Sequence, residues 1–297
     1  MPTSSERLED ALLELAWSQW TELGVRGAVD RHPASSIDPE ALLALTAGLA
    51  ERDPRLRDES LDWCVKHHRY LSRSRLRNVL RRLPASYRTA YDRYAATLSA
   101  AGVRGWPAQA KPWPFEATCK SKLADLSRPA LARIRLRAIF GVSARAEILH
   151  VLAWQSSAWT SSAELAELAG YTKRNVDEEL DSLVRGGLVE AGLIGNRRMV
   201  RLADRASFEA LVGRPPDATP AWVTIVVVMA DLSALFQTSD TADPRVQDVE
   251  ATRLIDALSK RTGMTTLPPL PAGGPSAWEH LLQWALRLAA DPTSTNR

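Results

Sequence analysis

The chain has 297 residues, of which 45% are apolar and 25% are charged. This length favours two or three domains, and the composition is that of a globular protein rather than a disordered one. The longest apolar run, Ala221 to Ala230, is shorter than the ~20 residues that a membrane-spanning helix needs. The two cysteines, Cys64 and Cys119, match neither a metal-ligand spacing nor a disulfide framework. We therefore expect a soluble, cytoplasmic protein without a membrane partner.

Positive charge is concentrated in one part of the chain. The segment from Trp63 to Arg145 holds 18 Lys and Arg residues and three acidic residues, whereas the whole chain has a net charge of +3. The remainder of the chain is therefore net acidic. Such an asymmetry indicates a polyanionic partner, although it does not identify one.

Helical periodicity dominates the first hundred residues, and Asp-Pro pairs mark the starts of two helices. The expected helices are Leu8 to Gly24, Pro39 to Leu49, Pro54 to His68, Ser72 to Leu83 and Ser86 to Ala100. We predict that residues 1–104 form a helical domain. The segment 105–130 is rich in Pro and Trp, which is typical of a linker or a strapped loop.

The segment from Ser143 to Leu202 has a more specific pattern. A capping box, Ser161-x-x-Glu164, opens one helix, and Thr172 is placed to cap the next. Gly195-Asn196 then separates two alternating runs, as in a β-hairpin. The expected elements are helices Ala144 to Gln155, Ala163 to Ala169 and Lys173 to Arg185, and strands Leu188 to Leu193 and Arg197 to Leu202.

This order of elements, with the sequence ELAELAGYTKRNVDEELDSLVRGGLVEAGLIGNRRMVRL, resembles the winged helix-turn-helix core of MarR- and ArsR-like bacterial regulators. The resemblance covers about one fifth of the chain. It implies a winged-helix domain over residues 131–204 that binds double-stranded DNA.

The third helix of this segment begins with side chains suited to a DNA groove. A recognition helix reads base edges with its N-terminal residues; arginine binds guanine, asparagine binds adenine and lysine suits a phosphate. The candidates here are Thr172, Lys173, Arg174 and Asn175. Acidic residues follow at 177–179, so we expect only the first turn to read bases.

The tip of the hairpin is the second candidate contact. We expect it to reach flanking phosphates or the minor groove. Its candidate residues are Asn196, Arg197 and Arg198.

A further basic feature precedes the winged-helix segment, since the window from Trp63 to Tyr91 contains no acidic residue. The helix expected after Ser72 resembles the second helix of another helix-turn-helix, with Arg73, Arg75 and Arg77 as DNA-binding candidates. Alternatively, this face pairs with the acidic helical segments at 6–10 and 53–62. The sequence leaves both interpretations open.

Residues 205–297 are predicted to form a helical domain for dimerisation, partner binding or ligand sensing. One of its helices is apolar nearly all round, which indicates burial. The expected helices are Arg205 to Gly213, Trp222 to Phe236, Thr252 to Lys260 and Pro275 to Ala290. In the preceding domain, His150 is predicted to be a packed core histidine, because it lies within an apolar run.

The sequence therefore predicts a mainly α-helical protein with a small β-hairpin wing. The expected function is that of a DNA-binding transcriptional regulator, of the repressor type, that dimerises on a pseudo-palindromic site. Recognisable catalytic motifs, phosphate-binding loops and metal-ligand clusters are absent from the sequence, so we expect no enzyme activity, cofactor or metal.

Three alternatives remain from the sequence. The chain is similar to winged-helix antitoxins, which hold a toxin and repress their own operon, in joining a basic winged helix to further helices. A winged helix used for protein contacts alone is the second alternative, because a fold does not determine a function. A component of a nucleic-acid enzyme or a mobile element is the third.

Overall fold

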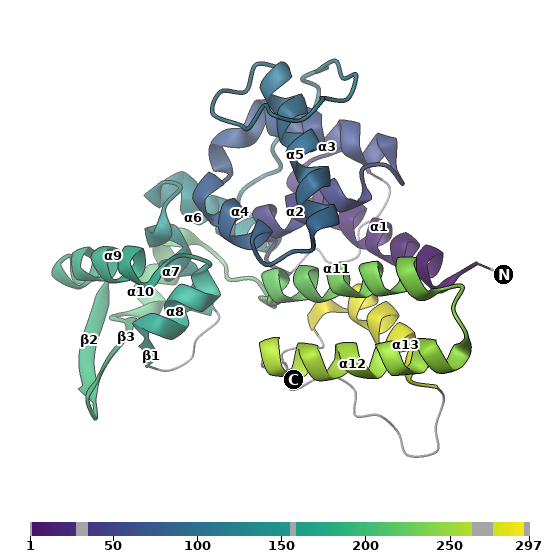
Figure 1. The fold of residues 1–297 in the computed structure, drawn as a ribbon. Helices are drawn as coiled ribbons and strands as arrows, with labels where there is room; N and C mark the ends of the chain where they lie inside the picture. Colours follow the sequence, from purple (N-terminus) through teal and green to yellow (C-terminus); the bar gives the residue numbers. More distant parts are fainter. Residues whose placement is uncertain (1, 28–34, 155–158, 263–275, 294–297) are drawn as a thin grey trace.

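The computed structural model describes residues 2–27, 35–154, 159–262 and 276–293. These residues form a mainly helical protein with one small antiparallel sheet, as predicted (Figure 1). The helices before residue 144 are α1 (Ser4–Leu23), α2 (Pro39–Leu49), α3 (Pro54–His67), α4 (Arg73–Leu80), α5 (Ala85–Ala100) and α6 (Ala132–Phe140). The later helices are α7 (Ala144–Trp154), α8 (Ser162–Ala169), α9 (Lys173–Arg185), α10 (Arg205–Val212), α11 (Trp222–Ser239), α12 (Pro244–Thr262) and α13 (Ala277–Ala290).

Helix starts agree well with the sequence because their caps are local. Asp38 and Asp53 accept hydrogen bonds from the backbone N–H groups three residues later, at the starts of α2 and α3. α12 is longer than predicted, since the expected start at Thr252 lies inside a helix that begins at Pro244. Two residues at the ends of predicted elements lie outside the described residues: Gln155 and Pro275.

Helices from the N-terminal and the C-terminal parts of the chain share one apolar core. Side chains of α1 to α5 pack with those of α11 to α13, and Trp20, Trp63 and Phe236 are fully buried among them. α11 packs against α1 and α2, and α13 packs against α1 (Figure 1). The structure thus differs from the predicted separate domains at 1–104 and 205–297, because the C-terminal helices complete the N-terminal core. We call these eight helices the helical body.

A second apolar core lies in the central lobe, which we define as α7 to α10 together with the sheet. Phe208 and Val212 of α10 pack into this core, although the sequence assigned them to the C-terminal domain. α6 joins the two parts: its Ile134 lies in the core of the helical body and its Leu136 in that of the central lobe.

The sheet of the central lobe has three strands in the order β1 (Thr160–Ser161), β3 (Arg197–Leu202) and β2 (Val189–Ile194). β3 is antiparallel to both neighbours, with Val200 opposite Thr160 on one side and Ala191 on the other. The hairpin β2–β3 therefore extends one edge of the lobe.

The predicted linker 105–130 is an irregular strap that follows the surface of the helical body. Trp113 is buried against the body, and the Asp62 carboxylate of α3 accepts hydrogen bonds from the backbone N–H groups of Cys119 and Ser121. These contacts hold the segment against the helical body.

α11 is the one helix in the described part of the chain that is long and apolar enough to cross a membrane. It packs against α1, α2 and α12, and Ile225, Val228 and Leu232 are fully buried. Such burial is that of a core helix, as its all-round apolar sequence predicts.

The strap passes so close to the end of α1 that only glycine fits there. Gly24 has a φ of +101°, and a Cβ atom on it would lie 2.2 Å from the carbonyl oxygen of Lys122. Gly102 has a similar φ of +90° but open space around it.

We expect Gly24→Ala to lower the free energy of unfolding more than Gly102→Ala does. Both substitutions force an L-residue into a left-handed backbone, at a cost of about 1–3 kcal/mol, but only the first displaces the strap. Urea unfolding of the two variants measures the difference. Equal losses would contradict the close passage of the strap.

Candidate nucleic-acid interface

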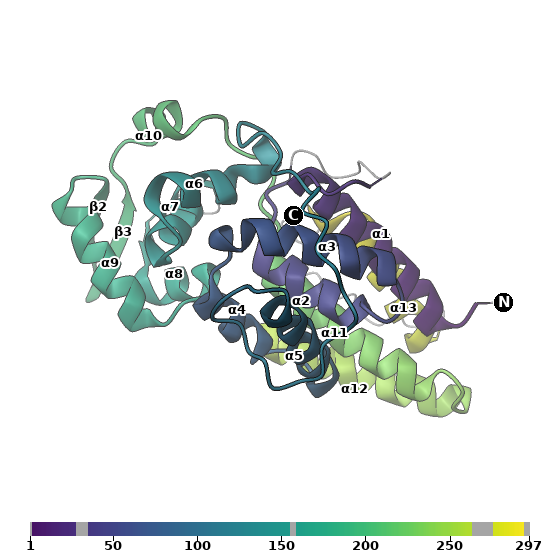
Figure 2. The ribbon, with the colours of Figure 1, turned by 90° about the horizontal axis from the view of Figure 1, so that it is seen from above.

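α4 of the helical body lies against the turn that leads into α9. The hydroxyl oxygens of Ser72 and Tyr171 are 2.6 Å apart, and the Asn78 amide donates to the carbonyl oxygen of Gly170 at 3.0 Å. Seen from above in Figure 2, α4 lies at the side of the central lobe that carries α8. The two basic features that the sequence singled out are therefore neighbours in space.

The start of α9 is exposed. Thr172 is its N-cap and accepts a hydrogen bond from the backbone N–H of Asn175. The four residues Thr172 to Asn175 all face solvent, and the Arg174 side chain is 88% exposed. This turn is free to approach a large ligand.

The cations of α9 and of the hairpin form ion pairs within the central lobe. The pairs are Lys173–Asp177 at 2.7 Å, Arg174–Glu178 at 3.0 Å and Arg198–Asp181 at 2.7 Å. Each such exposed pair stabilises a protein by only about 0.2–1 kcal/mol, so these cations can exchange their carboxylate partners at little cost. The acidic side chains follow directly after the first turn of α9, so the rest of this helix is not a cationic surface.

The hairpin tip carries the predicted polar residues together with two aliphatic ones. Asn196 and Arg197 are exposed, and Arg198 is half-buried. Leu193 lies opposite Arg198 and Ile194 lies opposite Arg197, with exposed fractions of 78% and 55% for the two aliphatic side chains. The predicted strand Leu188 to Leu193 includes only the first of these two residues, and its pattern does not reveal that either side chain is exposed.

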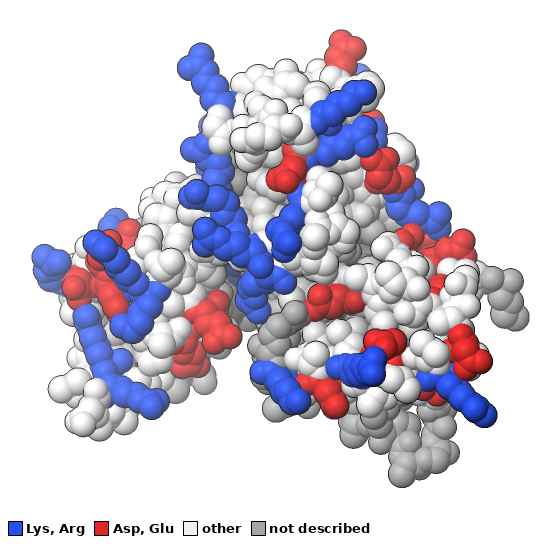
Figure 3. All heavy atoms as spheres, viewed as in Figure 1, with Lys and Arg blue, Asp and Glu red and all other residues white. Residues whose placement is uncertain are grey.

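α4 and its C-cap residue Arg81 present three arginines, Arg73, Arg77 and Arg81, at a spacing of four residues on one exposed face. Within the described chain none of the three forms an ion pair: Arg73 donates to the carbonyl oxygen of Gly105 and Arg81 to the amide oxygen of Asn78. In Figure 3 a band of Lys and Arg side chains covers the α4 region, whereas both signs alternate on the central lobe. The excess positive charge is therefore on α4 and not on α9.

The prediction that Arg75 contacts DNA is wrong. Its side chain points away from Arg73 and Arg77, because two residues of helix turn it by about 200°. It is 1% exposed, and its guanidinium contacts the carboxylates of Asp38 and Glu40. The alternative interpretation, pairing with acidic residues, is correct for this arginine, although its partners are not in the segments expected.

Arg75 belongs to a buried ion network at the junction of the helical body and the central lobe. Three arginines face three carboxylates, and each of the six side chains is at most 3% exposed. Its members are Asp38 and Glu40 at the start of α2, Arg75 of α4, Arg133 and Arg137 of α6, and Glu147 of α7.

Arg137 is the central bridge of this network. One of its Nη atoms lies 2.7 Å from Glu40 in the helical body and 2.7 Å from Glu147 in the central lobe. Arg133 and Arg75 also contact Glu147. Buried charges of both signs are tolerable only when they are paired in this way, so the network holds the two parts in one relative position.

The network determines the ionisation of Glu147. Burial alone would raise the pKa of this carboxyl group, but the charges of Arg133, Arg137 and Arg75 lower it to about 2. Burial would also raise the pKa of the Asp38 carboxyl group, but the charges of Arg75 and Arg133 lower it below its ordinary value. Both carboxyl groups are therefore ionised in the folded protein at neutral pH.

His150 lies beside the network and is fully buried, which confirms the predicted core histidine. Its Nε2 atom is 2.8 Å from the hydroxyl oxygen of Ser36. Burial and the charge of Arg133 keep its pKa well below the ordinary value, so the imidazole is neutral.

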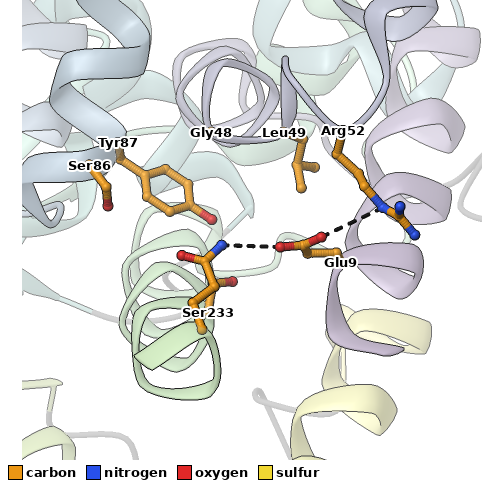
Figure 4. A pocket seen from close by; sticks show the side chains of 8 residues that line it. Glu9, Gly48, Leu49, Arg52, Ser86, Tyr87 and Ser233 are labelled. Carbon is orange, nitrogen blue, oxygen red and sulfur yellow. Dashed lines mark hydrogen bonds and ion pairs between the residues drawn. The ribbon is translucent and has the colours of Figure 1, made fainter. Parts of the chain in front are cut away.

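A small polar cavity lies among α1, α2, α5 and α11 (Figure 4). Gln237 donates to the Glu9 carboxylate at 3.1 Å, Arg52 lies 3.6 Å from the same group, and the Tyr87 hydroxyl points toward it. Its volume of about 80 Å³ suits about two or three water molecules, whereas ligand pockets have roughly 300–1,000 Å³. We interpret it as a hydration site.

Comparisons with protein-family models, curated proteins and solved structures find no match for this chain. In the described residues, no group of three His, Cys, Asp or Glu side chains is arranged to hold a metal ion. The function of the chain is therefore to be inferred from the geometry of α4, α9 and the hairpin.

We expect Glu147→Gln to lower the free energy of unfolding by about 3–5 kcal/mol, because it removes a charge that buried arginines require. Glu190→Gln is the matched control, since Glu190 pairs with Arg201 at the surface of the same lobe. Its loss should stay below about 1 kcal/mol. Urea unfolding that gives both variants the same loss would contradict a structural role for the network.

The buried groups also predict a loss of stability in acid. Below about pH 6.5 the unfolded chain protonates His150, which the folded protein keeps neutral. The contribution of Glu147 is complete above its unfolded pKa of 4.5 and is lost as the pH falls toward 2. Urea midpoints measured from pH 7 to pH 3 should fall throughout; a constant midpoint would contradict this assignment.

Proposed function

We propose that the chain binds double-stranded DNA and that its central lobe acts as a winged helix-turn-helix. In this proposal α8 and α9 are the helix-turn-helix pair, α9 is the recognition helix, and the hairpin β2–β3 is the wing. The observation that carries the proposal is the contact between α4 and the turn before α9, which places an unpaired cationic face beside an exposed helix start.

The first turn of α9 enters the major groove. Arg174 and Asn175 are placed to read base edges, and Lys173 to contact a phosphate. Their ion pairs with the following acidic residues are exchanged for contacts with DNA, at the small cost of an exposed pair.

α4 supplies most of the attraction for the phosphate backbone. Arg73, Arg77 and Arg81 carry charges that no acidic residue within the described chain neutralises, unlike the cations of α9. Lys and Arg that replace condensed counterions on DNA provide affinity without reading sequence. In this proposal α9 therefore reads the bases and α4 binds the phosphates.

The biological role that fits this surface is that of a cytoplasmic transcriptional regulator, of the repressor type. We propose a homodimer on a pseudo-palindromic site, since two-fold symmetric DNA sites match symmetric dimers. The sequence resemblance to MarR- and ArsR-like regulators supports this role and does not require an enzyme activity.

A second candidate function rests on the ion pairs of the central lobe. A lobe whose cations are balanced by its own acidic residues is also suited to protein contacts. In this case the chain is an interaction protein, similar to winged-helix antitoxins, that holds a partner such as a toxin and regulates its own operon.

The test is a selection of duplexes with a random central segment by the full chain, followed by binding at several salt concentrations. Enrichment of one sequence, with an affinity that falls steeply with salt, supports the DNA-binding proposal. If no sequence is enriched and salt has no effect, the proposal is overturned and the protein-binding candidate is favoured.

Arg174→Ala and Arg77→Ala should affect this binding in different ways. The first should cost about 1–3 kcal/mol on the selected duplex and little on a scrambled one, because it removes a base contact. The second should weaken binding to both duplexes alike and lower the salt slope by about 0.9. Fluorescence anisotropy titrations measure both quantities.

Arg253→Ala is the matched control for these two variants. Arg253 is 71% exposed and pairs with Glu250 on α12, in the helical body. Its substitution should leave both affinities unchanged. If Arg174→Ala keeps the affinity and the specificity of the unmodified chain, α9 is not the recognition helix.

A further inference from the structure

Leu193 at the hairpin tip is the most exposed large apolar side chain in the described part of the chain, and its neighbour Ile194 is also exposed. Leu193 lies in the same row of β2 as Val189, which is 2% exposed in the core of the central lobe. The hairpin therefore extends an apolar row past the end of the core and into solvent. Large aliphatic side chains in such a position indicate a surface that becomes covered.

The positive charge around this tip indicates what kind of molecule covers the exposed aliphatic side chains. Residues 191–199 contain two arginines and no acidic residue. Each face of the tip presents one aliphatic and one cationic side chain, because Leu193 lies opposite Arg198 and Ile194 lies opposite Arg197. Arg198 already pairs with Asp181 of α9. A protein partner with an apolar surface would leave Arg197 without a counter-charge, whereas a DNA groove offers both apolar and anionic groups.

We propose that the hairpin tip is a minor-groove wedge that enters the groove end-on, in which Leu193 presses into a base step while Arg197, on the opposite face of the hairpin, lies along the groove. This inference rests on the proposed DNA binding. Proteins that enter the minor groove use aliphatic wedges to unstack a step and bend the duplex, and arginine is attracted by the negative potential of the groove. The wedge follows from the pairing of exposed aliphatic and cationic side chains at one tip.

The wedge gives the protein a specificity that α9 does not provide. Unstacking is easiest at pyrimidine–purine steps, such as TA and CA/TG. The selected duplexes should therefore contain such a step beside the sequence read by α9, at a position without a base-edge contact.

The experiment uses the duplex selected by the full chain, labelled at both ends for energy transfer and carrying 2-aminopurine beside the flexible step. Binding of the unmodified chain should raise the energy transfer, because the ends approach, and the 2-aminopurine fluorescence, because the base unstacks. Leu193→Ala should still bind but should lose most of both signals. Leu211→Ala is the matched control, since Leu211 is 66% exposed on α10, and it should keep both.

The outcomes separate this inference from the proposed function. If the unmodified chain binds the selected duplex without bending it, or if Leu193→Ala bends it equally, the wedge is overturned and the proposed DNA binding stands. If Leu193→Ala binds and bends DNA normally but loses self-association in sedimentation, the tip is a protein contact and the wedge is again overturned. If no duplex is bound at all, both proposals fail.

Discussion

The buried ion network is the constraint on which the rest of the molecule depends. Two apolar cores form from different parts of the chain, and apolar packing alone allows two such bodies to rotate against each other. Arg137 prevents this, because it pairs with Glu40 of the helical body and with Glu147 of the central lobe. Any rotation would leave buried charges without partners, at a cost of several kcal/mol per ion.

This fixed arrangement gives α4 its position. Arg75 has its guanidinium in the network, and its Nε atom donates to the carbonyl oxygen of Ala169 at the end of α8. The opposite face of α4, with Arg73 and Arg77, is therefore held at a constant distance from the start of α9. A surface assembled from two bodies can bind a rigid ligand such as a duplex only when its parts keep their spacing, and the network supplies that spacing.

Several parts of the structure were predictable because their causes are local. Asp38 and Thr172 cap their helices through side chains that reach backbone groups three residues away. The bounds of α9 and β3 agree with the prediction for the same reason: a cap, an apolar stripe and glycine turns all lie within a few residues of one another. The exposed start of α9 also follows from the pattern, since its polar residues precede the apolar stripe.

Other parts depend on contacts between distant residues. Arg75 and Arg77 are indistinguishable in the sequence, yet one is buried among carboxylates and the other is exposed. The same holds for Leu193, which follows the strand pattern but extends beyond the core. The joint core of α1 to α5 with α11 to α13 is a third case, because an apolar helix does not specify which partner will cover it.

The sequence by itself determined the helical class, most helix starts, the hairpin and the candidate residues at its tip and at the start of α9. These follow from periodicity and from hydrogen bonds between near neighbours. Only the tertiary structure decided which arginines are free of acidic partners, which parts share a core, and that α4 lies against the turn before α9. Arg137 and Glu40 pair although they are 97 residues apart in the chain. The residues around a charged side chain do not indicate which distant residue will pair with it.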